Sequence, residues 1–104
     1  MDGVIFKDIN FWMELHKRFG TLEQGKILTQ QYLHSDYARL VEEVVVRLWK
    51  GRDATPYWSL VNEIEYFPGV KEVMEYVKRN DLISAIISAS SMDVARRVQR
   101  DFGI

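Results

Sequence analysis

The sequence contains no cysteine, only two histidines and two prolines, and almost no net charge, with 14 basic and 15 acidic residues. The absence of cysteine excludes disulfides, thiolate catalysis and cysteine-based zinc sites. A formal net charge of −1 creates no field that would attract nucleic acid or an anionic membrane. No apolar run approaches the ~20 residues of a membrane span, and the N-terminal residues lack the basic region of a signal peptide. We therefore expect a cytoplasmic protein with no nucleic-acid or membrane partner.

The 104 residues, 47% apolar and 28% charged, have the size and composition of one soluble domain. Folding at this size hides roughly 60–70% of the surface of the unfolded chain, so a single modest core is possible.

Helical periodicity dominates the stretch from residue 9 to residue 65. Thr21 with Gln24 resembles a capping box, and Ser35 is the expected N-cap of the clearest helix. That helix shows one continuous apolar face at a 3.6-residue period, formed by Tyr37, Leu40, Val41, Val44, Val45, Leu48 and Trp49. Thr55-Pro56 opens a further helix.

Two apolar segments flank a helix that begins near Val70. Residues 3–6 and residues 82–88 are apolar and β-branched, which predicts strands buried in a parallel sheet. Ser90 or Ser91 caps a last helix. The order of strand, helix and strand predicts an α/β fold, although two strands make an incomplete sheet.

Few residues suggest chemistry. Asp2 lies beside the first expected strand, where it is either a solvated terminal residue or a carboxylate at a ligand site. Ser88 closes the second expected strand, where its hydroxyl either fills a turn or holds an anion at a helix N-terminus. His16 and His34 lie in separate expected helices, and only tertiary structure would join them in a zinc site.

These features together resemble the haloacid dehalogenase (HAD) superfamily, in its phosphoserine-phosphatase-like branch. Residues 1–5, Met-Asp-Gly-Val-Ile, resemble the end of the first motif, Asp-x-Asp-Gly-(Thr/Val). Residues 86–88, Ile-Ile-Ser, resemble the second motif, an apolar strand that ends in Ser or Thr. Residues 67–70, Phe-Pro-Gly-Val, resemble the return from a helical cap. The resemblance implies a partial HAD-like, Rossmann-like α/β core at residues 1–8 and 66–104, with an inserted helical cap at residues 9–65.

The family implies a Mg²⁺-dependent phosphatase that acts on a small phosphorylated metabolite through an aspartyl-phosphate. In that mechanism the first Asp of the first motif attacks phosphorus, and the second protonates the leaving oxygen and later activates water. Mg²⁺ neutralises charge between carboxylate and phosphate. Carried over, Asp2 is the general acid/base and its backbone carbonyl is a Mg²⁺ ligand. Ser88 is the phosphate-holding hydroxyl, with the Ala89 N–H beside it.

The sequence also departs from the family pattern. The nucleophilic Asp would precede Met1, and the third and fourth motifs would follow Ile104. We therefore expect a fragment that is inactive on its own. The presence of Asp2 favours phosphatases or phosphomutases over haloalkanoate dehalogenases, which generally lack this second acid.

The substrate is less well defined. The positions of the phosphoserine-specific Glu and Arg fall near Ile9 and Val44, and Asp8, Arg39 or Arg47 could compensate for them.

Two readings without catalysis stay open. One is a helical fragment that forms a homodimer through exposed core or cap surfaces, or that complements the open sheet edge of another chain. The other is an unrelated all-helical binding module, which requires residues 82–88 to be helical.

Overall fold

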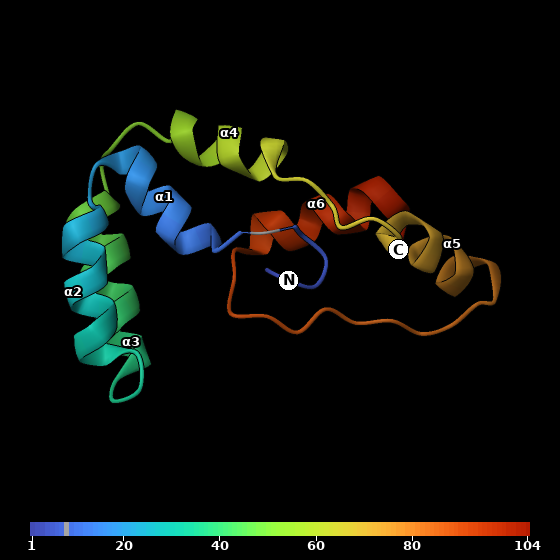
Figure 1. Cartoon of the computed structure of the whole chain (residues 1–104), viewed down its shortest axis with the longest axis horizontal. Coiled ribbons are helices and arrows are strands. Elements are labelled where there is room, and N and C mark those ends of the chain that lie inside the picture. The colour runs from blue at the N-terminus through green and yellow to red at the C-terminus, as the bar shows by residue number, and fades with distance from the viewer. Residues whose placement is uncertain (8) are drawn as a thin grey trace. The chain divides into compact units, whose positions relative to one another are not determined.

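The computed structural model describes residues 1–7 and 9–104 (Figure 1). Its helices are α1 (Phe11–Phe19), α2 (Leu22–Tyr32), α3 (Tyr37–Val41), the π-helix η1 (Glu42–Trp49), α4 (Thr55–Glu63), α5 (Val70–Arg79) and α6 (Met92–Phe102). The described residues form no strand and no sheet. The expected α/β fold is therefore wrong, and the fold is all-α. In the described part of the chain, no helix combines the length and the apolarity needed to cross a membrane.

The chain divides into two compact units. Unit 1 comprises Met1–Phe11 and Trp58–Ile104, and unit 2 comprises Trp12–Tyr57. The expected division into a core and a cap at residues 8/9 and 65/66 stays a prediction.

The first expected strand is a tight turn in unit 1. The carbonyl oxygen of Met1 accepts hydrogen bonds from the backbone N–H groups of Val4, Ile5 and Phe6 at 2.9–3.2 Å. Gly3 has a φ of +70°, which glycine adopts without the steric penalty of a side chain. Within the turn, these bonds pair backbone N–H groups that a neighbouring strand would pair in a sheet. Residues 3–6 therefore do not form an extended strand.

One pair of backbone hydrogen bonds joins this turn to a distant segment. Lys7 donates to the carbonyl of Glu65, and Phe67 donates to the carbonyl of Ile5, both at 2.9 Å. They flank a single antiparallel bridge between Phe6 and Tyr66. The N-terminal turn is thus attached to the segment that follows α4.

The second expected strand, residues 82–88, is neither a strand nor a helix. It forms most of the long trace that connects α5 to α6 in Figure 1. A strand requires a neighbour for its backbone groups, and no described segment pairs with this one. The all-helical binding module would require these residues to be helical, and that expectation is also wrong.

Arg97 on α6 holds unit 1 together. Its guanidinium donates to the carbonyls of Val61 and Ile64 at 2.8 and 2.7 Å. These carbonyls lie at the C-terminal end of α4, where a helix leaves its last acceptors unpaired. The same guanidinium lies over the rings of Phe6 and Tyr66, 5.5 and 4.8 Å from their centres. One cation therefore joins α4, α6 and the N-terminal turn.

Asp101 completes this arrangement. It accepts a hydrogen bond from the Tyr66 hydroxyl at 2.7 Å and one from Nε of Arg97 at 3.3 Å. The bond from Tyr66 is the main reason that the pKa of Asp101 is lowered. Burial, reinforced by the bond to Asp101, raises the pKa of Tyr66 to about 12. The phenol thus stays a donor and the carboxylate an acceptor throughout the neutral range.

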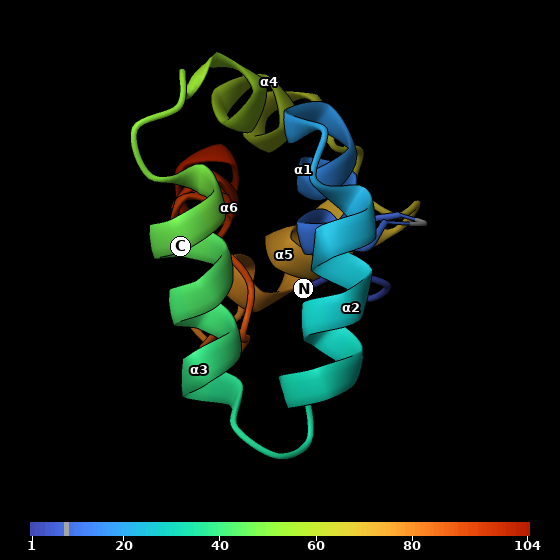
Figure 2. The same ribbon diagram turned by 90° about the vertical axis from the view of Figure 1, so that its left-hand side faces the viewer.

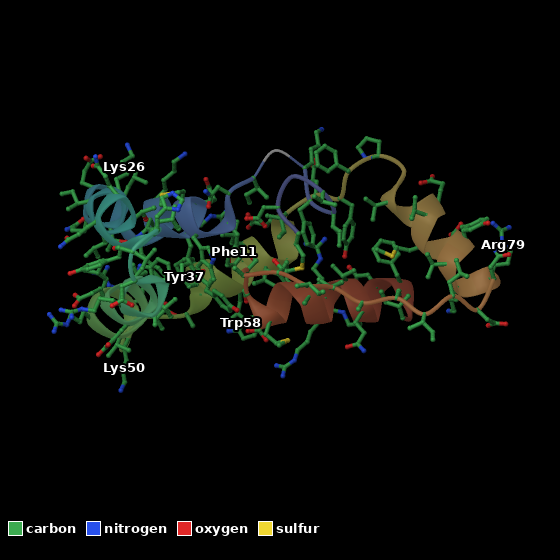
Figure 3. All side chains as sticks on the ribbon, turned by 90° about the horizontal axis from the view of Figure 1, so that it is seen from below. Phe11, Lys26, Tyr37, Lys50, Trp58 and Arg79 are labelled. Atoms are coloured by element: carbon green, nitrogen blue, oxygen red, sulfur yellow. The ribbon has the colours of Figure 1, made fainter. Side chains whose placement is uncertain are left out.

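Unit 2 contains two antiparallel helical segments, α2 and α3–η1 (Figure 2). Asp36, and not Ser35, caps α3 by accepting from the Arg39 backbone N–H at 3.1 Å. Ser35 instead donates to the carbonyl of Gln31. Lys26 and Lys50 point outward from this unit (Figure 3).

The π-helix alters the apolar face that the sequence predicts. Lys50 donates to the carbonyl five residues earlier, that of Val45, at 2.9 Å. The buried residues of this stretch are consequently spaced by four and then five positions, at Leu40, Val44 and Trp49. The apolar face that the sequence predicts is only partly buried, because Tyr37, Val41 and Val45 are exposed.

Replacing Arg97 by lysine tests the role of its guanidinium. Lysine keeps the charge but cannot donate to both carbonyls in one plane. We expect Arg97→Lys to lower the free energy of unfolding by about 2 kcal/mol, since hydrogen bonds from charged groups contribute ~1.5–3 kcal/mol. Urea unfolding measures the change. Arg96→Lys is the matched control, because the Arg96 side chain is 71% exposed whereas that of Arg97 is 12% exposed. Equal effects of the two substitutions would contradict the assigned role.

Candidate functional site

The candidate site lies in unit 1, where the N-terminal residues meet the segment before α6. The Met1 nitrogen donates a hydrogen bond to Oγ of Ser88 at 3.4 Å, across a separation of 87 residues. In Figure 1 the N-terminus accordingly lies between α6 and the extended segment that leads into it. The two motif-like regions of the sequence are thus neighbours in space, although no sheet joins them.

Ser88 forms the turn that leads into α6. Its Oγ accepts a second hydrogen bond, from the Ser90 backbone N–H at 3.1 Å, in a common turn motif of serine. A serine hydroxyl has two acceptor lone pairs and one donor hydrogen. Both hydrogen bonds use the oxygen as acceptor, so the hydroxyl hydrogen is suited to donate to an anion. Ser88 and the following Ala89 are exposed.

Ser90 and Ser91 have different roles at the start of α6. Oγ of Ser91 accepts from the Asp93 backbone N–H at 3.2 Å, so Ser91 is the N-cap of the helix. This observation resolves the choice between the two serines. Oγ of Ser90 is buried without a hydrogen-bond partner. Buried hydroxyls are normally paired, so the enclosed and unpaired oxygen of Ser90 is unusual.

Asp2 has one engaged and one unengaged carboxylate oxygen. Oδ2 accepts from the Phe11 backbone N–H at 2.8 Å, and a carboxylate is favourable there because Phe11 begins α1. Oδ1 is buried and has no hydrogen-bond partner. Asp2 therefore holds the start of a helix through one oxygen, and its other oxygen is enclosed and unpaired. The sequence pattern gives no sign of the contact with Phe11.

A Mg²⁺ ion requires several oxygen ligands in nearly octahedral geometry. Within residues 1–7 and 9–104, no three histidine, aspartate or glutamate side chains are grouped as metal ligands. The ligand that the resemblance implies is the backbone carbonyl of Asp2, and the described side chains do not supply the further ligands of a magnesium site.

The other residues expected near the substrate lie elsewhere or make other contacts. Arg39 and Arg47 both pair with Glu43 in unit 2, at 2.9 and 3.5 Å. The hydrogen bond to Glu43 is also the main cause of the raised pKa of Arg39. Val44 is buried, and Asp8 lies outside the described residues. The structure thus provides no support for phosphoserine as the substrate.

A second polar cluster, in unit 2, contains His16. The ring is 2% exposed, and its Nδ1 lies 2.8 Å from Oγ1 of Thr21. The same Oγ1 accepts from Nε1 of Trp49 at 3.1 Å. Thr21 therefore connects two buried rings and makes no side-chain capping bond to α2, so the expected capping box is wrong. His34, by contrast, is exposed.

The His16 cluster is tightly packed. A Cβ atom on Gly25 would lie 2.6 Å from the His16 ring, so only glycine allows this approach of α2 to α1. Burial lowers the pKa of His16, against a smaller opposing effect of hydrogen bonding to Thr21. These contacts describe a structural histidine with satisfied neighbours.

Comparison of the chain with protein-family models, with curated proteins and with solved structures finds no match.

The buried His16 predicts that stability depends on pH. Its pKa is lower in the folded than in the unfolded chain, where it is 6.5. The contribution is complete above pH 6.5 and is lost as the pH falls through the folded-state pKa, because the unfolded chain then binds the proton more readily. We expect urea unfolding to show a loss of stability below pH 6.5 that is smaller in His16→Gln.

Exposed His34 supplies the control, since His34→Gln should leave this part of the pH dependence unchanged. If His16→Gln does not fold, NMR titration of the imidazole in the parent chain replaces it. A His16 midpoint at or above pH 6.5 would refute the assignment.

Proposed function

We propose that this chain carries the acid/base and phosphate-holding residues of a HAD-type phosphatase that acts on a small phosphorylated metabolite in the cytoplasm. The observation that carries the proposal is the contact between Met1 and Ser88. The resemblance assigns the two regions to one phosphate site, and they meet although 87 positions separate them.

The chemistry of the two regions supports the proposal. The Ser88 hydroxyl is suited to donate to a phosphate oxygen, and the N-terminus of the 11-residue helix α6 favours an anion nearby. Together these groups form a small set of donors beside a helix start.

Asp2 is the proposed general acid/base. Its free Oδ1 would give a proton to the leaving oxygen of the phosphate ester and later take one from water. Its bond to the Phe11 N–H fixes the carboxylate group while this oxygen reacts. When bound, Mg²⁺ would neutralise charge between this carboxylate and the phosphate.

Phosphate binding tests the proposed role of Ser88. We expect inorganic phosphate to shift the backbone amide signals of residues 88–91 in NMR titrations. Ser88→Ala should weaken this binding about fivefold, the equivalent of one ordinary hydrogen bond of ~1 kcal/mol. Ser84→Ala is the matched control, because Ser84 is an exposed serine four positions earlier in the same segment.

Absence of amide shifts at residues 88–91, or equal affinity in the parent and Ser88→Ala, would refute the proposed phosphate site.

The proposal also predicts that these 104 residues do not turn over a phosphate ester. The resemblance assigns the acid/base role to Asp2 and assigns the nucleophile to no residue of this chain. We expect no release of p-nitrophenol from p-nitrophenyl phosphate with Mg²⁺. Turnover that Asp2→Asn abolishes would show that Asp2 also acts as the nucleophile, contrary to the assignment.

A further inference from the structure

The segment that connects α5 to α6 is extended, apolar and uncovered. Ile83 is 103% exposed and Ile87 is 96% exposed, and Leu82 is also exposed. Figure 3 shows Arg79 at the end of α5, shortly before the segment begins. From Leu82 to Ala89 there is no charged residue. Two isoleucines with full exposure leave an apolar surface that favours association.

The backbone of this segment also lacks partners. For residues 83–87, the described part of the chain provides no backbone hydrogen bond. Extended backbone with unpaired N–H and C=O groups is a template for another strand. Its β-branched side chains suit that conformation. The segment therefore presents both the side chains and the hydrogen-bonding groups of an edge strand.

The sequence around Ala85 is complementary to itself. In an antiparallel pair centred on Ala85, each Ile83 lies opposite Ile87 of the second copy, and Ala85 lies opposite Ala85. Residues 83, 85 and 87 share one face of a strand, so the four fully exposed isoleucines of the two copies meet on that face. A two-fold axis through Ala85 makes the contact closed and identical for both copies.

Charge favours the antiparallel arrangement over the parallel one. Asp81 precedes the segment in a turn with a φ of +51° and is not part of the extended strand. In a parallel pair in register, both Asp81 residues would lie at the same end of the pair, where like charges repel. The antiparallel pair places them at opposite ends. The position of Asp81 thus favours an antiparallel pair of copies over a parallel one.

We propose that residues 82–88 form an antiparallel two-stranded interface with the same segment of a second copy, centred on Ala85. The interface joins the chains through backbone hydrogen bonds and through the pairs of Ile83 with Ile87. The interface would include the backbone of Ser88, whereas the proposed phosphate chemistry uses the Ser88 hydroxyl and Asp2.

Single cysteines introduced into the cysteine-free chain test the register. Opposed residues in an antiparallel pair have Cα atoms ~4.5–5.5 Å apart, within disulfide range. Ala85→Cys should therefore form a disulfide-linked dimer about tenfold or more faster than Ile27→Cys. Ile27 is a suitable control because it is an exposed isoleucine on α2.

The positions on either side provide a second test of the register. Two copies of Ile83→Cys place their cysteines ~14 Å apart along the strands, so this variant alone should not cross-link faster than the control. A mixture of Ile83→Cys with Ile87→Cys should cross-link as Ala85→Cys does. Without oxidant, sedimentation should show a dimer for the parent chain and a monomer for Ile83→Lys/Ile87→Lys.

Three results would overturn the proposal. The first is a parent chain that stays monomeric in sedimentation. The second is rapid self-linking of Ile83→Cys, which would indicate a parallel pair in register. The third is a dimer that persists in Ile83→Lys/Ile87→Lys, which would place the interface elsewhere.

Discussion

The rest of unit 1 depends on the contacts that the guanidinium of Arg97 makes. The all-α unit has no sheet to carry its backbone hydrogen bonds, and α5 has no buried residue to contribute to a core. The elements that do bury residues are α4, α6 and the N-terminal turn. Arg97 lies on α6 and contacts the other two. It satisfies the carbonyls at the end of α4 while its flat face covers two aromatic rings. An ordinary apolar residue could fill the space but would leave those carbonyls unpaired.

The position of α6 in turn decides where the candidate site lies. Ser88, Ser90 and Ser91 precede the first turn of this helix, so their location follows from its packing. The position of Asp2 is fixed by the N-terminal turn. This turn is attached at Tyr66, whose ring stacks on that of Phe6. The proximity of Met1 to Ser88 is thus a result of how α4, α6 and the turn are joined, and a sheet is not needed to bring it about.

Local sequence pattern predicts the helices of this chain well, because a helix satisfies its own backbone. Periodicity and Gly20, Gly51 and Gly103 place the helix limits close to those observed, and Ser91 caps α6 as one of the two expected serines. The strands fail for the complementary reason. The stability of a strand depends on its neighbours, and among residues 1–7 and 9–104 no adjacent strand pairs with residues 3–6 or 82–88. The capping box at Thr21 fails because Trp49, 28 positions away, uses the same hydroxyl. Similarly, Asp2 and Ser88 are identifiable from motif-like sequence, whereas the contact with Phe11 and the buried Ser90 oxygen depend on tertiary structure alone.

The π-helix has a consequence for how this segment tolerates changes in length. Its hydrogen bonds span five residues where an α-helix spans four, so the turn that ends at Lys50 contains one residue more than an α-helical turn requires. Deleting one residue between Val44 and Trp49 would return their spacing to four, matching that of Leu40 and Val44, and the tryptophan would stay on the buried face beside Thr21. The core contact of Trp49 can therefore survive the loss of the one extra residue that η1 contains.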